Sequence, residues 1–192
     1  MANQDAAFGL KAIGKVGQNR DNQGLSEYSI AANATAIYQG DPVEMLATGT
    51  IGVAAAGDTL LLGPLTGVFY TDASTSKPTW ANHLNASNTA TDIVGFVSDD
   101  PYERFEIQSN NAGASNANDV FAVADIAYAA GSTPDYISGV ELNDSTIANG
   151  SSATLQILGA SKDPSNNDVG SANVNWVVRI NEHELDMNVN GV

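Results

Sequence analysis

The run IVGFVSDDPYERFEIQ, residues 93–108, decides the fold class of this chain. Its last four residues, FEIQ, alternate apolar and polar side chains, which is typical of a strand with one buried face. In the middle of the run, Pro101 follows two aspartates, as in a turn. The run therefore predicts a strand at Ile93 to Ser98, a turn, and an edge strand at Arg104 to Gln108.

Further short apolar runs, separated by Gly, Asn, Asp, Ser and Thr, have the same character and also predict strands. They are Ser26 to Ala31, Ala36 to Tyr38, Pro42 to Leu46, Gly52 to Ala55, Leu65 to Tyr70, Gly139 to Leu142, Ala153 to Leu158 and Trp176 to Ile180. We therefore expect a mainly β protein, with a β-barrel or β-sandwich body over residues 25–192. The strand order stays open.

One or two short helices are expected within this body. The best candidate is Ala117 to Ala129, because apolar residues recur there at positions 120, 123, 124, 127 and 128, the spacing of one helix face. Asn118 or Asp119 near its start would act as the cap, and Gly131 would end it.

The opening stretch MANQDAAFGLKAIGKVGQNRDNQG, residues 1–24, predicts an extended N-terminal arm. It has too little apolar patterning to fold alone, so something else must order it. Lys11, Lys15 and Arg20 are three of the seven basic residues, and Asp5 is the only acid among the first twenty, which gives this part about +2. The rest of the chain then carries −17, for an overall charge of −15. Such asymmetry is typical of an interaction tail.

Composition argues against several classes of partner. A net charge of −15 repels phosphate backbones and anionic lipids, so we expect no nucleic acid and no membrane partner. The sequence has no apolar run of about 18 residues and no signal-peptide pattern at its start. The absence of cysteine removes disulfides, thiolate metal sites and cysteine nucleophiles.

Few residues offer catalytic chemistry. The two histidines, His83 and His183, lie about one hundred positions apart, and His183 stands between two glutamates in an alternating segment. A surface or packing role is more common for such a histidine than a role as base or ligand. Serine-nucleophile and phosphate-binding glycine motifs are missing. We therefore expect a non-enzymatic protein with no catalytic residues, no cofactor and no metal.

Two acidic stretches offer weaker alternatives. Asp99, Asp100, Glu103 and Glu106 are carboxylates of the kind that serve glycoside hydrolysis or calcium binding, but their spacing argues against such a site, and a turn that leads into an edge strand explains every residue of the run. Residues 163–170 place oxygen ligands at nearly alternate positions without the closing glutamate of an EF-hand, which favours an Asx-rich turn.

Aromatic residues suggest a separate binding site. Tyr70, Trp80 and His83 flank one polar loop and are candidates for a platform on which a sugar ring stacks. Trp80 is explained better as an anchor that pins this loop onto the body, since tryptophan buries a large area.

Four segments carry a resemblance that extends over most of the chain: MANQDAAFGLKAIGKVG at residues 1–17, AIYQGDPVEM at 36–45, GFVSDDPYERFEIQ at 95–108 and VNWVVRINEHEL at 174–185. The chain resembles capsid decoration, or cement, proteins of tailed bacteriophages, notably those of marine and cyanobacterial hosts. The resemblance implies a virion protein on the outer surface of the capsid. Such proteins sit near threefold positions, often as homotrimers, and bridge subunits of the major capsid protein.

The arm supplies the candidate contact residues. Apolar anchors and basic groups alternate along it, and we expect them to contact the capsid or another subunit: Phe8, Leu10, Lys11, Ile13, Lys15 and Arg20. The alternative function is a head-fibre or tail module that binds host-surface glycan through Tyr70, Trp80 and His83. A glycan-cleaving enzyme built on the carboxylates of residues 99–106 is a third and weaker class.

Overall fold

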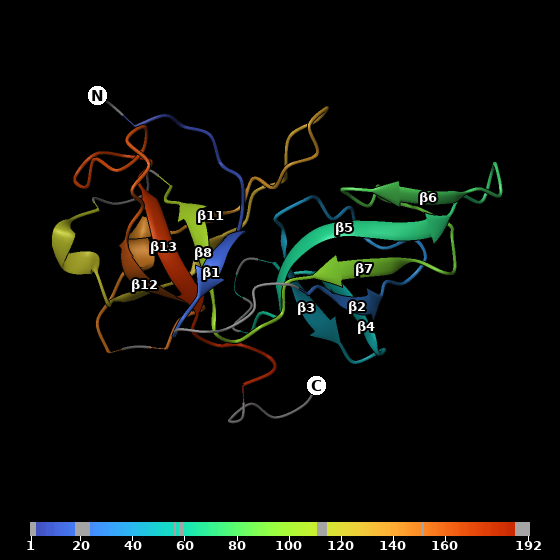
Figure 1. The fold of residues 1–192 in the computed structure, drawn as a ribbon, viewed down its shortest axis with the longest axis horizontal. Helices are drawn as coiled ribbons and strands as arrows, with labels where there is room; N and C mark the ends of the chain where they lie inside the picture. Colours follow the sequence, from blue (N-terminus) through green and yellow to red (C-terminus); the bar gives the residue numbers. More distant parts are fainter. Residues whose placement is uncertain are drawn as a thin grey trace.

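Two antiparallel sheets lie at opposite ends of the long axis and form a sandwich-like body (Figure 1). The computed structural model describes residues 3–17, 24–55, 57, 60–110, 115–150 and 152–186. The mainly β prediction is confirmed. Of the two expected architectures the sandwich is the better description, because the sheets do not close into a barrel.

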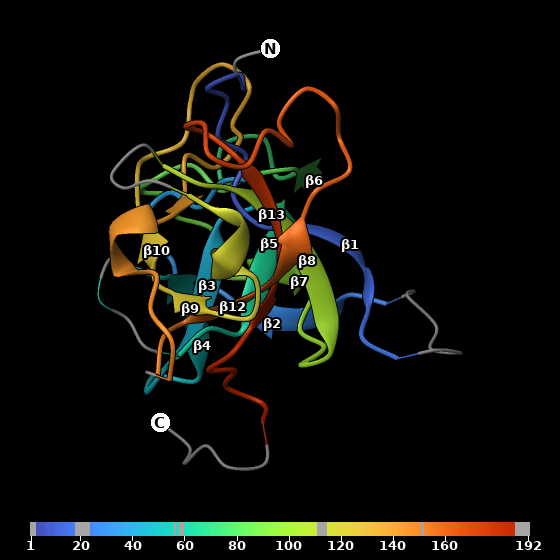
Figure 2. The ribbon, with the colours of Figure 1, turned by 90° about the vertical axis from the view of Figure 1, so that its left-hand side faces the viewer.

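The first sheet has five strands in the order β1-β8-β13-β12-β9, and Figure 2 shows β1 at one edge and β9 toward the other. The strands are β1 (Lys11–Lys15), β8 (Glu103–Gln108), β9 (Val123–Ala124), β12 (Leu155–Ala160) and β13 (Asn175–Ile180). Alternate side chains of the central strands point into one apolar core, including Phe105, Ile107, Leu155, Trp176 and Val178. Burial of these side chains is the main force that holds the sheet to its covering segments.

The second sheet has the order β2-β7-β5-β3-β4, with β6 paired to β5. Its strands are β2 (Ser26–Ser29), β3 (Pro42–Leu46), β4 (Thr50–Val53), β5 (Gly63–Thr71), β6 (Pro78–Ala81) and β7 (Val94–Val97). A separate core lies under this sheet and includes Ile37, Ile51, Leu65, Val68 and Ile93. The chain therefore builds two apolar cores rather than one.

The turn at residues 98–103 carries the chain from one sheet to the other. β7 belongs to the second sheet and β8 to the first, so the two strands predicted around Pro101 do not pair with each other. The expectation that residues 104–108 form an edge strand is wrong, because β1 pairs with one side of β8 and β13 with the other.

The prediction of a helix at Ala117 to Ala129 is also wrong. The segment forms a short 3₁₀ helix, η1 (Ala117–Asp119), then β9, then β10 (Ile126–Ala127), which pairs with β11 (Glu141–Leu142). Phe121 has a φ of +75°, which stops a helix, and the amide of Phe121 donates to the carbonyl of Ile157 on β12. Pairing with a distant strand therefore overrides the local periodicity. A second 3₁₀ helix, η2, spans Asp144–Thr146.

The N-terminal segment is extended, and contacts with other parts of the same chain hold it in place. The side-chain amide of Asn3 donates to the carbonyl of Ala172 at 2.8 Å, and the amide of Ala6 donates to Oε1 of Gln108 at 2.8 Å. Beyond Leu10, β1 then adds to the edge of β8. Residues 18–23, within the predicted arm, lie outside the described residues.

A close contact between two glycines fixes where this segment crosses the body. Gly9 has a φ of +70°, and a Cβ atom there would lie 2.2 Å from the carbonyl oxygen of Gly40 and 2.6 Å from the side chain of Ser138. The next amide, of Leu10, donates to that same Gly40 carbonyl at 2.9 Å. Both the positive φ and the close approach of two backbones require glycine.

We predict that Gly9→Ala lowers the free energy of unfolding by about 2 kcal/mol or more, because backbone strain adds to a steric clash with Gly40 and Ser138. The matched control is Gly49→Ala, where φ is +77° but no atom lies within 4 Å of the added Cβ. That variant should lose only about 1 kcal/mol, the cost of the strained φ. Urea denaturation measures both, and equal losses would show that the segment moves aside freely at Gly9.

Candidate functional site

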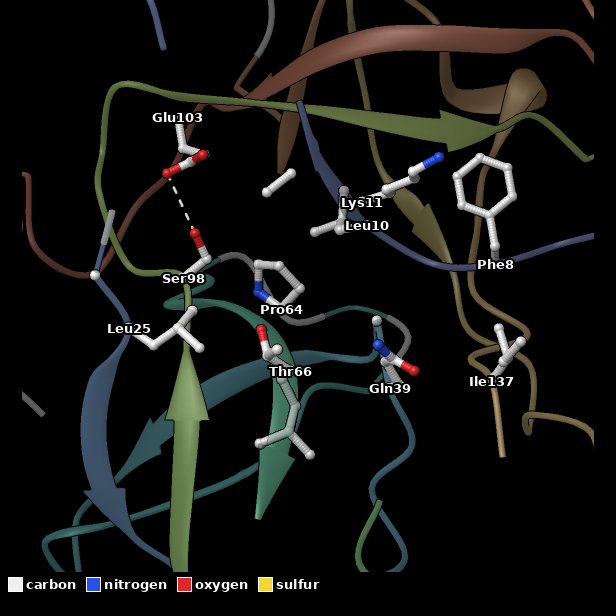
Figure 3. A pocket seen from close by; sticks show the side chains of 14 residues that line it. Phe8, Leu10, Lys11, Leu25, Gln39, Pro64, Thr66, Ser98, Glu103 and Ile137 are labelled. Carbon is white, nitrogen blue, oxygen red and sulfur yellow. Dashed lines mark hydrogen bonds between the residues drawn. The ribbon is translucent and has the colours of Figure 1, made fainter. Parts of the chain in front are cut away.

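A cleft opens between the two sheets, with a volume of about 430 Å³ (Figure 3). The N-terminal segment forms one wall, and the residues just before β2 together with the beginning of β5 form the other. The labelled lining side chains are Phe8, Leu10, Lys11, Leu25, Gln39, Pro64, Thr66, Ser98, Glu103 and Ile137.

The cleft is mostly apolar, with one buried acid. Glu103 is only 6% exposed, and its carboxylate accepts a hydrogen bond from the Ser98 hydroxyl at 3.2 Å. Burial raises the pKa of Glu103, while the Ser98 hydroxyl and the charge of Lys15 partly offset this rise. The cleft is therefore suited to an apolar side chain, and the part near Glu103 is poorly suited to an anion.

The strand that borders the cleft has an open edge. β1 is the terminal strand of its sheet, and no strand in the described part of the chain pairs with its outer side. Ile13, at the β-bulge of this strand, is 44% exposed, and the Lys11 side chain is also exposed. An open edge beside an apolar cleft is the arrangement that accepts an added strand from a partner.

The structure separates the residues predicted as partner contacts. Phe8 and Lys11 line the cleft, and Ile13 lies on the open strand beside it. Leu10 is 2% exposed and belongs to the first core, and its side chain also lines the cleft. The ammonium of Lys15 forms an ion pair with Asp100 at 2.6 Å. Arg20 lies outside the described residues.

An aromatic patch lies on the outer face of the second sheet. Trp80 on β6 is 55% exposed, lies opposite Phe69 on β5, and packs against Phe96 on β7 with ring centroids 4.9 Å apart. A Cβ atom at Gly67 would come within 2.6 Å of the Trp80 ring, so the ring covers the backbone of β5 there. Trp80 is therefore not the buried anchor of a loop that was expected, but an exposed side chain on a strand.

Tyr70 and His83 do not join Trp80 in one platform. Tyr70 follows Phe69 on β5 and packs against the second core, on the other face of the sheet. The imidazole of His83 stacks on the Tyr136 ring at 3.6 Å, with the ring of Tyr38 edge-on to both. Burial lowers the pKa of His83, although a hydrogen bond with Asn85 partly offsets this. Phe69 and Phe96, which no pattern in the sequence marked, are the neighbours of Trp80.

The contacts of His183 are those of a residue that supports the fold. It is buried, its Nδ1 accepts from the amide of Leu185 at 3.0 Å, and burial lowers the pKa of its imidazole. The segment around it runs beside Leu61, since the Leu61 amide donates to the carbonyl of Glu182. The segment that holds His183 therefore ties the end of β13 to the residues just before β5.

The acidic run at residues 99–106 makes structural contacts. Asp99 accepts from the hydroxyl of Tyr28 at 2.6 Å, Asp100 accepts from the amide of Tyr102 at 2.8 Å, and Glu106 accepts from the side chain of Asn175 at 3.3 Å. In the loop at 163–170, Asp163 accepts from the amide of Ser165, as an Asx turn requires. These contacts explain both stretches without a ligand.

Across the described residues, no group of three or more histidine, aspartate or glutamate side chains is arranged to hold a metal ion. Within the same residues no helix has the length and apolar character to span a membrane. Comparison of the chain with protein-family models, curated proteins and solved structures found no match in any of the three.

We predict that Glu103→Gln stabilises the protein more at about pH 8 than at about pH 4. The raised pKa means that the folded state retains the Glu103 proton above the ordinary pKa of 4.5, so this stability is lost as the pH rises through the folded-state pKa. The neutral amide avoids that loss and still accepts from Ser98. Urea denaturation at the two pH values measures the difference, with exposed Glu27→Gln as the control. A gain that is the same at both pH values would contradict the burial of an ionisable Glu103.

Proposed function

We propose that this chain is a non-enzymatic structural protein of a phage virion, which binds the outer surface of the capsid and stabilises the shell by bridging subunits of the major capsid protein. One observation carries the proposal: an exposed edge strand, β1, lies beside an apolar cleft of about 430 Å³. The resemblance of four segments to capsid decoration proteins supports the identity of the partner.

The geometry fits an extended segment of the partner. Such a segment would pair its backbone with the open side of β1 and place apolar side chains in the cleft between Phe8, Leu25 and Ile137. Backbone hydrogen bonds would supply affinity, and the cleft would select the side chains. Exposed Lys11 on β1 would favour an acidic group on the capsid segment.

The charge of the chain supports the outer location. A net charge of −15 repels packaged nucleic acid and keeps particles apart in solution. In a homotrimer, three copies of the β1 edge would bind one shell together, so modest contacts would give long residence through avidity.

We predict that Lys11→Glu combined with Ile13→Ser lowers occupancy on the capsid at least about tenfold, because it reverses one charge and removes one apolar contact from the open edge. Occupancy is measured by co-sedimentation with shells assembled from the major capsid protein of the same phage. Cryo-electron microscopy of decorated shells then locates the density.

The matched control is Lys77→Glu combined with Phe121→Ser, which makes the same kinds of change at exposed positions outside the cleft lining. Its occupancy should equal that of the unaltered protein. No binding of the unaltered protein to shells would overturn the capsid function, whereas equal binding of all three proteins would overturn only the assignment to the β1 edge.

A second candidate function is recognition of host-surface glycan, which the exposure of Trp80 favours. Sugar rings stack on exposed tryptophan faces, and the patch of Trp80, Phe69 and Phe96 offers such a face. This proposal replaces the predicted grouping of Tyr70, Trp80 and His83, whose members face different directions.

We predict for this second function that Trp80→Ala abolishes saturable binding on a glycan array, because the stacking surface is removed. Phe121→Ala, which truncates another exposed aromatic ring, is the control and should bind as before. An array on which the unaltered protein binds no sugar would exclude the glycan function and leave the capsid proposal as it stands.

A further inference from the structure

A buried carboxylate lies at the start of η2 without the partners that such a group needs. Asp144 is 7% exposed, and neither of its carboxylate oxygens makes a hydrogen bond of good geometry with any described residue. Buried carboxylates are normally paired or hydrogen-bonded, because an uncompensated buried charge is costly. Asp144 therefore calls for a specific explanation.

Side chains from three separate segments act on this carboxylate. Ser109, at the end of β8, and Ser115 place their hydroxyls near enough to Asp144 to act on its ionisation. The Ser115 hydroxyl is also buried, and it too makes no hydrogen bond of good geometry with a described residue. Asp119, the last residue of η1, is also buried, and its charge acts on the same carboxylate. The site is thus rich in oxygen, and none of the groups that act on Asp144 is positively charged.

The electrostatics of the site are those of an uncompensated anion. The pKa of Asp144 is raised to about 6, mainly because the carboxylate is buried, and the charge of Asp119 adds to this rise. The hydroxyls of Ser109 and Ser115 partly oppose it. The groups that act on this carboxylate include no lysine and no arginine. A bound cation would supply the missing positive charge.

The donor set selects the kind of cation. Carboxylate and hydroxyl oxygens are hard ligands, which suit calcium or magnesium rather than zinc or copper. Two carboxylates with neutral oxygens around them form an irregular set, and calcium accepts six to eight oxygens in variable geometry, whereas magnesium demands a near-ideal octahedron. Calcium is therefore the better fit.

We propose that Asp144, with Asp119 and the hydroxyls of Ser109 and Ser115, binds a calcium ion. The ion would join the end of β8 to η1 and η2. Two hydrogen bonds already link the residues after β8 to those around η2: the Asn110 amide donates to the Leu142 carbonyl at 2.9 Å, and the Asp144 amide donates to Oδ1 of Asn110 at 3.1 Å. It would fix the loops at this end of the first sheet. The site stands apart from the cleft and does not depend on the capsid function.

We predict that millimolar calcium chloride raises the midpoint of thermal unfolding of the chelator-treated full chain by about 5 °C near neutral pH. Isothermal titration calorimetry should show one calcium ion per chain. Asp144→Asn should abolish both effects, and it should fold at least as well without calcium, because it removes a buried charge. Ser115→Ala, which keeps both carboxylates, should weaken binding without abolishing it.

Asp168→Asn is the matched control. It removes one exposed acid from the loop at 163–170, the other calcium candidate in the sequence, and it should bind calcium as the unaltered chain does. Potassium chloride at equal ionic strength separates specific binding from screening of the net negative charge. The proposal is overturned if calcium causes no shift and no binding heat, if Asp144→Asn responds like the unaltered chain, or if Asp168→Asn alone loses the response.

Discussion

The contact between the backbones of Gly9 and Gly40 is the constraint on which the rest of the structure depends. Gly40 belongs to the part of the molecule that is built on the second sheet, since its amide donates to the Leu65 carbonyl on β5. Gly9 precedes Leu10, which fills a place in the first core, and β1, which closes the edge of β8. One crossing therefore sets both the position of an edge strand in one sheet and the wall of the cleft against the other.

Strands were predictable because their signal is local. Alternation at residues 105–108 and the apolar run at 176–180 specify strands in any β fold, and the structure has β8 and β13 there. Sheet membership was not predictable, because it depends on which distant strands pair. The same reason explains the error at residues 117–129: the short strands β9 and β10 produce the apolar spacing of a helix face, and only their pairing with β12 and β11 distinguishes them from a helix.

The candidate sites followed the sequence only in part. Trp80 and Lys11 could be selected as candidates from their residue type alone. The exposure of Trp80, however, follows from the register of β6 on β5. The burial of Leu10 follows from the close contact between Gly9 and Gly40. Asp144 lies in a segment, ELNDST, that looks like an ordinary polar turn. Its significance depends on burial and on the hydroxyls of Ser109 and Ser115, which are far from Asp144 in sequence, so no local pattern contains them.

The way the sheets are joined bears on how a partner would act. Residues near both ends of the described chain connect them: Leu10 donates to Gly40, and the carboxylate of Glu184 accepts from the amide of Met45 on β3 at 2.8 Å. Between these two ties the sheets keep separate cores, and the cleft opens between them. A segment bound in the cleft would contact Leu25 and Thr66 on one side and Phe8 on the other. Its binding would add a further connection between the sheets, so binding of the proposed capsid segment would also stiffen this protein.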